Sequence, residues 1–168
     1  DQAFLAFDRF LQGLRSGVQI FSMIKANPQL LDLIARILGS APRLAQQVSR
    51  QPRILEAVLE SGFFGPLPDL DELADVANTM IPLGTPLEEA MDRARILGRE
   101  QMFRVSVRLL SETMHAEEAG AGYSNIADVL LRTCLAAVRR DMEEHHGKIA
   151  GASCAIIAMG KLGSREMT

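Results

Sequence analysis

Residues 85–118 read TPLEEAMDRARILGREQMFRVSVRLLSETMHAEE, and this stretch decides the fold class. Thr85 and Glu88 have the spacing of a capping box, and Pro86 stands at the first helical position, where proline is favoured. The stretch therefore predicts one long helix from Pro86 to about Glu118. Its apolar residues recur at helical spacing: Leu87, Ala90, Met91, Ala94, Leu97, Met102, Val105 and Leu109.

Further helices are expected on both sides of this one. Gly120 and Gly122 are expected to break the helical pattern, and Ser124 then begins a second long helix that Gly147 ends. Before residue 85, apolar periodicity and punctuation by proline and glycine predict helices over about residues 2–14, 16–27 and 28–39. A short helix is expected to begin at Ser40–Pro42, another to begin at Pro52 and include residues 54–59, and one capped by Asp69 to run to about Met80. The expected fold is mainly α, a multi-helix bundle whose spine is the two long helices.

The composition agrees with a helical globular protein. The chain has 168 residues, of which 48% are hydrophobic and only 5% aromatic. Leucine, alanine and methionine form helices well, whereas strands are rich in aromatic and β-branched residues. A chain of this length buries a core without disulfides or metals. Cys134 and Cys154 have neither metal-ligand nor disulfide-framework spacing, so we expect two buried thiols and a cytoplasmic location.

The charge balance and hydropathy argue against two classes of partner. The formal net charge is -3, from 18 Lys+Arg against 21 Asp+Glu, whereas nucleic-acid binders present a basic face to phosphates. The arginines of residues 93–108 are interleaved with acidic residues, including Glu100 four positions before Arg104, which favours a solvated, ion-paired face. No apolar run approaches the roughly 20 residues that span a bilayer. We expect neither nucleic acid nor a membrane as partner.

The last segment differs from the rest. Residues 154–159, CAIIAM, are a short apolar run that leads into Gly160-Lys161-Leu162-Gly163-Ser164. Such a run before a glycine-rich turn favours a buried strand, whose sheet partners would lie beyond Thr168. We therefore divide the chain into a helical domain, residues 1–150, and the first strand and turn of a second, truncated α/β domain, residues 151–168.

The glycine-rich turn is the candidate binding motif. Glycine allows the backbone of such a turn to approach phosphate oxygens closely, and Lys161 and Ser164 add a charge and a hydroxyl. The candidate nucleotide-binding residues are Gly160, Lys161, Gly163 and Ser164. The bare pattern fits a simple turn at a strand end equally well.

Two other clusters of polar side chains are weaker candidates for a functional site. His145 and His146 are adjacent, so they point about 100° apart on a helix, and we interpret them as a solvated helix end, not as metal ligands. Asp69 and Asp71 are a carboxylate pair in a helix-capping loop. No catalytic residue and no metal ligand is therefore expected within this chain. Residues 61–69, SGFFGPLPD, form the clearest loop.

Two stretches together resemble one known family. Residues 155–168, AIIAMGKLGSREMT, resemble the start of the nucleotidyltransferase domain of glutamate–ammonia-ligase (glutamine synthetase) adenylyltransferases. Residues 27–59, NPQLLDLIARILGSAPRLAQQVSRQPRILEAVL, resemble the helical stretch before the C-terminal catalytic half of these enzymes, and residues 87–109 fit as well. Ser164 stands where many relatives have glycine.

The resemblance implies a function for the parent enzyme. Members of the family transfer AMP from ATP to a tyrosine of glutamine synthetase, and a related half removes it, in the regulation of nitrogen metabolism. They use Mg²⁺ and respond to the PII signalling protein. The family's metal-binding carboxylates follow the turn and would lie beyond Thr168, so the resemblance implies that this chain alone is inactive. The alternative is a non-catalytic helical module that docks glutamine synthetase or PII through the loop of residues 61–69.

Overall fold

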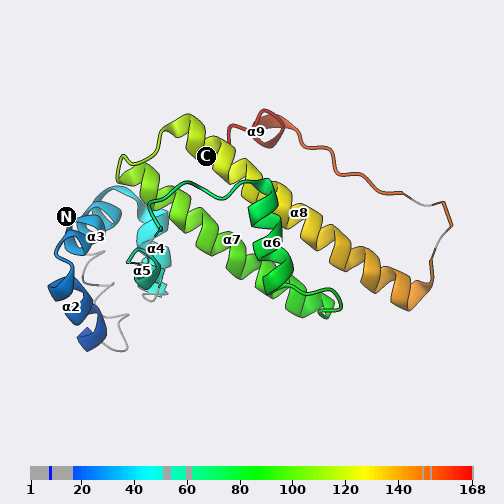
Figure 1. Cartoon of the computed structure of the whole chain (residues 1–168), viewed down its shortest axis with the longest axis horizontal. Helices are drawn as coiled ribbons and strands as arrows, with labels where there is room; N and C mark the ends of the chain where they lie inside the picture. Colours follow the sequence, from blue (N-terminus) through cyan, green and yellow to red (C-terminus); the bar gives the residue numbers. More distant parts are fainter. Residues whose placement is uncertain are drawn as a thin grey trace. The chain divides into compact units, whose positions relative to one another are not determined.

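The computed structural model describes residues 8, 17–50, 54–59, 62–148, 150–151 and 153–167 (Figure 1). It is mainly helical, which confirms the helical part of the predicted fold class. The chain divides into two compact units: unit 1 comprises residues 1–65 and 106–113, and unit 2 comprises residues 66–105 and 114–168. The helix expected over residues 2–14 lies outside the described residues, apart from Asp8.

Unit 1 is built from short helices. They are α2 (Gly17–Ala26), α3 (Gln29–Ser40), α4 (Pro42–Arg50) and α5 (Ile54–Ala57). Helix α3 packs against α2 and α4 and has a strongly one-sided apolar pattern, because its hydrophobic residues recur every three or four positions. Its buried side chains are Leu30, Leu33, Ile34, Ile37 and Leu38.

Unit 2 is built on three helices: α6 (Leu70–Met80), α7 (Leu87–Leu110), which belongs to this unit as far as Val105, and α8 (Ala116–His146). Helices α7 and α8 lie side by side and run in opposite directions (Figure 1). The three helices share one core, to which each contributes buried residues: Leu73 and Ala77 from α6, Leu97 and Val105 from α7, and Ala119, Ile126 and Val129 from α8.

The boundary between the two long helices differs from the prediction. Helix α7 ends at Leu110, and α8 begins at Ala116 and continues through Gly120 and Gly122. Glu112 adopts a left-handed φ of 57°. The amide of Thr113 donates to the carbonyl of Arg108 at 3.0 Å, and that of Glu112 donates to Leu109 at 3.1 Å. These bonds form a Schellman motif at the C-terminus of α7, in which a glutamate occupies the left-handed position that is usually glycine.

Gly120 and Gly122 serve close packing and do not break the helix. A Cβ at position 122 would lie 2.6 Å from Cδ1 of Leu67 and 3.4 Å from Cγ2 of Val105. Ser124, which we expected to begin the second helix, is instead buried inside it, and its hydroxyl donates to the carbonyl of Gly120 at 2.8 Å. The predicted end at Gly147 is confirmed, because this residue follows His146 with a φ of 79°.

Of the two helix caps expected from the sequence, the one at Asp69 is formed and the one at Thr85 is replaced by a turn. At Asp69 the capping box is complete, since one carboxylate oxygen accepts from the amides of Asp71 and Glu72, and the Glu72 carboxylate accepts from the amide of Asp69 at 3.0 Å. The Thr85 hydroxyl instead donates to the carbonyl of Pro82 at 2.7 Å. It therefore closes the turn before α7.

The expected strand near the C-terminus is not formed. Residues 153–159 have no regular secondary structure and are exposed, and Gly160–Gly163 form a one-turn helix, α9. A strand needs a neighbour for its backbone hydrogen bonds, and the described residues contain no second strand for it to pair with. For the same reason Cys154 is exposed instead of buried, while Cys134 is half-buried and its pKa is raised by desolvation.

Replacing Asp69 with alanine should destabilise unit 2. Asp69→Ala removes both capping bonds to the first turn of α6 and should lower the free energy of unfolding by about 1 kcal/mol, as measured by urea denaturation. Asp75→Ala is the matched control, because Asp75 is an exposed residue within the same helix. Equal stabilities for the two variants would contradict a structural role of the cap.

Candidate functional site

The glycine-rich turn folds as a single helical turn, closed by its own backbone. The amide of Ser164 donates to the carbonyl of Gly160 at 2.9 Å, that of Arg165 to Leu162 at 3.2 Å, and that of Glu166 to Lys161 at 2.8 Å. These three amides are therefore engaged within the turn. A ligand that accepted hydrogen bonds from them would have to open it.

Two glycines of this turn are required by its geometry. Gly160 has a φ of 59°, in the left-handed region that side chains disfavour. A Cβ on Gly163 would lie 2.8 Å from the carbonyl oxygen of Ala158, a backbone atom that cannot rotate away. The choice of glycine at both positions therefore follows from the fold of the turn itself.

The polar side chains of the turn are exposed. Lys161 presents an ammonium group at the surface of unit 2. The hydroxyl of Ser164 lies 3.3 Å from a carboxylate oxygen of Glu166 and 3.4 Å from the carbonyl of Lys161. The four predicted residues thus lie together, with one cation and one hydroxyl that an anion could reach, and a carboxylate beside the hydroxyl.

The turn rests on the first third of α8, which the sequence did not indicate. A Cβ on Gly120 would lie 3.4 Å from Cα of Glu166 and 3.4 Å from the carbonyl oxygen of Met167. The guanidinium of Arg165 donates to the side-chain oxygen of Asn125. The sequence signal for this contact was Gly120, which we interpreted as a helix break.

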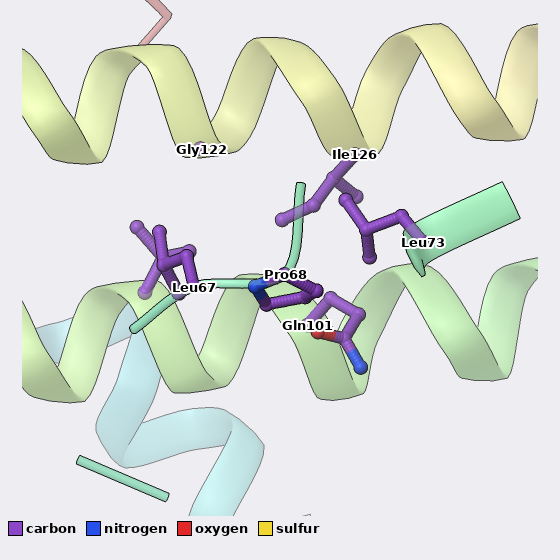
Figure 2. A pocket seen from close by; sticks show the side chains of 7 residues that line it. Leu67, Pro68, Leu73, Gln101, Gly122 and Ile126 are labelled. Atoms are coloured by element: carbon purple, nitrogen blue, oxygen red, sulfur yellow. The ribbon is translucent and has the colours of Figure 1, made fainter. Parts of the chain in front are cut away.

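A pocket between α7 and α8, in the described part of unit 2, is too small for a ligand. Its cavity volume is about 10 Å³, at the lower limit for a single water molecule. Figure 2 shows that Leu67 and Pro68, which precede α6, lie in the space between α7 and α8. The pocket is therefore a gap in side-chain packing. Its lining residues are Leu67, Pro68, Leu73, Gln101, Val105, Gly122 and Ile126.

The described residues offer no metal centre, since they contain no group of three or more His, Cys, Asp or Glu side chains that could hold an ion. The Asp69 carboxylate is used by the helix cap. His145 and His146 are exposed in the last turn of α8, where the sequence predicted a solvated helix end.

The arginines of α7 form the predicted ion-paired face at two positions. Arg93 pairs with Glu89 at 2.6 Å, and Arg95 pairs with Asp92. Arg104 donates to the carbonyl of Pro66 at 3.1 Å, and its expected pairing with Glu100 stays a prediction. Acidic residues of α7 thus neutralise part of the positive charge of its arginines. No helix in the described part of the chain has the length and apolar composition needed to cross a membrane.

The loop of residues 61–69 presents one aromatic side chain to solvent. Phe63 is 7% exposed and Phe64 is 45% exposed, and their rings meet edge to face with centroids 5.1 Å apart. Only one of the two phenylalanines therefore anchors the loop.

Comparison with known proteins identifies the family. The family model for glutamate-ammonia ligase adenylyltransferase matches residues 31–168, which include the glycine-rich turn. The chain belongs to the glutamate-ammonia ligase adenylyltransferase family. No solved structure matches the chain significantly.

Curated relatives match this family member over its whole length. It is 42% identical over 169 residues to a bifunctional glutamine synthetase adenylyltransferase/adenylyl-removing enzyme of Bradyrhizobium sp.. Proteins of the same name from Rhizobium meliloti and Brucella melitensis are 42% and 39% identical over 168 residues. Each match covers 100% of this chain and 17% of the relative. The chain thus spans about one sixth of the length of these adenylyltransferases.

His145, in the last turn of α8, has contacts that alter its pKa. The Nδ1 atom of His145 lies 2.8 Å from the carbonyl oxygen of Asp141 and 3.6 Å from its carboxylate. The backbone hydrogen bond raises the pKa of His145 above its ordinary value, and the carboxylates of Asp141 and Glu144 add to this. The imidazolium form thus stabilises the fold in acid, and this contribution is lost as the pH rises through the raised pKa.

Asp141→Asn should therefore lower the pKa of His145, because the nearest carboxylate is removed. The measurement is a pH titration of the His145 ring protons by NMR. Glu144→Gln is the control and should lower the pKa less, since the charge of Glu144 contributes less than that of Asp141. A pKa that is unchanged in Asp141→Asn would contradict the contact.

Proposed function

We propose that this chain is part of a bifunctional enzyme that transfers AMP from ATP to a tyrosine of glutamine synthetase and also removes it. The observation that carries the proposal is the family match over residues 31–168, together with about 40% identity to enzymes of that name over the whole chain. The proposed setting is cytoplasmic regulation of nitrogen metabolism, with glutamine synthetase and the PII protein as partners and neither nucleic acid nor a membrane.

In this proposal the two parts of the chain have different tasks. Residues 1–150 are a helical domain that positions the catalytic domain against its large protein substrate. Residues 151–168 enter the nucleotidyltransferase domain, within which residues 154–159 would pair as its first strand, followed by the turn. The exposure of residues 153–159 supports this division, because an apolar segment with Ile157 82% exposed lacks the packing partners that its composition favours.

The nucleotide would be held at the turn. Lys161 is the group that would attract phosphate oxygens, the Ser164 hydroxyl would donate a hydrogen bond, and Gly160 and Gly163 allow the turn to form. The residues described here do not fit a Mg²⁺ site, since no cluster of ligands is present among them. The proposed metal would therefore need carboxylates from elsewhere in the enzyme, and this chain alone should be inactive.

Substitutions in the turn test the proposal in the full-length enzyme that carries this segment. Lys161→Ala should raise KM for ATP about tenfold, since a charged hydrogen-bonding partner of the phosphates is lost. Lys148→Ala, which removes an exposed charge just after α8, should leave KM unchanged. Adenylylated tyrosine on glutamine synthetase is the readout. The proposed role of the turn fails if Lys161→Ala behaves like the control. Modification of glutamine synthetase by the 168-residue chain alone would contradict the expected inactivity of this chain.

A second candidate function is a docking module for glutamine synthetase or PII. The exposure of Phe64 favours it, because exposed aromatic residues often anchor protein interfaces. Phe64→Ser should then weaken binding of one of these proteins to this chain by more than about fivefold, as measured by calorimetry. Leu83→Ser is the control, since Leu83 is 95% exposed on another turn. Equal affinities for the two variants would exclude docking through Phe64.

A further inference from the structure

The contact between the glycine-rich turn and α8 has a role that the proposed function does not include. We propose that Gly120 and Asn125 of α8 are positioning residues, which hold the turn, and with it Lys161 and Ser164, in a fixed place on the helical core of unit 2. The inference rests on the proposed function for the task of the turn, but the contact itself is a separate observation.

Residues 153–159 form the segment that leads into the turn. Residues 153–159 are exposed along their whole length, so the segment that leads into the turn does not fix its position by packing. Gly120 and Asn125 of α8 both contact residues 165–167, at the C-terminal end of the turn. These two residues therefore contribute to the position of the turn on unit 2.

Gly120 of α8 lies against the backbone of residues 165–167. Cα of Glu166 and the carbonyl oxygen of Met167 would each lie 3.4 Å from a Cβ at this position, and the carbonyl oxygen of Arg165 would lie 3.5 Å from it. A single methyl group would touch these backbone atoms at ordinary contact distance. Any larger side chain would push the turn away from α8, so the residue at position 120 controls how closely the turn docks.

Arg165 connects the C-terminal end of the turn to α8. This residue has a φ of 60°, a left-handed conformation that is unfavourable for a residue with a side chain and persists where the surroundings hold it. Its guanidinium donates to the side-chain oxygen of Asn125, a charge-assisted bond between residues 40 positions apart. The bond thus fixes the C-terminal end of the turn to α8 at the point where its backbone is strained.

Limited digestion of this chain with trypsin tests the anchor directly. Cleavage after Arg165 should be about three- to tenfold faster in Asn125→Ala than in the unmodified chain, because the lost hydrogen bond no longer protects this site. Asn125→Asp should restore protection, since a carboxylate also accepts from arginine. Cleavage after the exposed Lys148 is the internal reference, and Arg132→Ala, which lies on α8 and pairs with Asp128, is the control variant.

Gly120→Val provides an independent variant that leaves both partners of the hydrogen bond in place. It should accelerate the same cleavage while circular dichroism shows an unchanged helix content. If Asn125→Ala is cleaved after Arg165 at the unmodified rate relative to Lys148, the turn is not anchored by Asn125 and the inference is wrong.

Kinetics of the full-length enzyme separate positioning from a merely structural role. Asn125→Ala should raise KM for ATP about three- to tenfold with kcat nearly unchanged, and Asn125→Asp should reverse the effect. Faster cleavage with an unchanged KM for ATP would overturn the positioning role. Failure of the proposed function gives a different result, in which Lys161→Ala leaves KM for ATP unchanged although the turn remains protected from trypsin.

Discussion

Unit 2 depends on how closely other segments can approach its central helices, and glycines of α7 and α8 lie at three of these contacts. A Cβ on Gly98 of α7 would lie 2.8 Å from Cδ1 of Leu130, and one on Gly122 of α8 would lie 2.6 Å from Cδ1 of Leu67. Gly120 lies against the backbone of residues 165–167 more loosely, since a Cβ there would be at ordinary contact distance, 3.4 Å or more. Glycine costs helix stability, so its use inside two long helices is compensated by the packing it permits. The core of three helices and the docking of the turn both follow from these contacts.

Features that are encoded locally could be predicted from the sequence. The helical fold class follows from apolar periodicity, and the capping box at Asp69 follows from residues at most three positions apart. The glycine at position 160 also fits its local backbone, because its φ lies in the left-handed region, while the nucleotide-binding role of the turn stays a prediction. In each of these cases the residues that determine the structure are close together in the chain.

Features that depend on distant residues could not be predicted. Whether Gly122 ends a helix or receives a neighbour is decided by Leu67, 55 positions earlier in the chain. The true end of α7 rests on a left-handed glutamate, for which sequence patterns give no signal. The strand expected at residues 154–159 was predicted from an apolar run before a glycine-rich turn, but a strand forms only with a partner, and its expected partners are not among the described residues. Asn125 was missed because nothing near it in the sequence indicates its contact with Arg165.

The exposed segment of residues 153–159 also affects the solubility of the chain. Ile156, Ile157 and Met159 are 51%, 82% and 82% exposed, and residues 154–159 carry no charge and no proline. Extended apolar segments of this length readily pair with identical segments of other molecules, because each supplies the backbone partners that the other lacks. Lys161, which immediately follows this stretch and Gly160, opposes such pairing by charge repulsion between copies. The same lysine that is proposed to attract phosphate thus also places a positive charge beside the segment whose composition favours pairing between molecules.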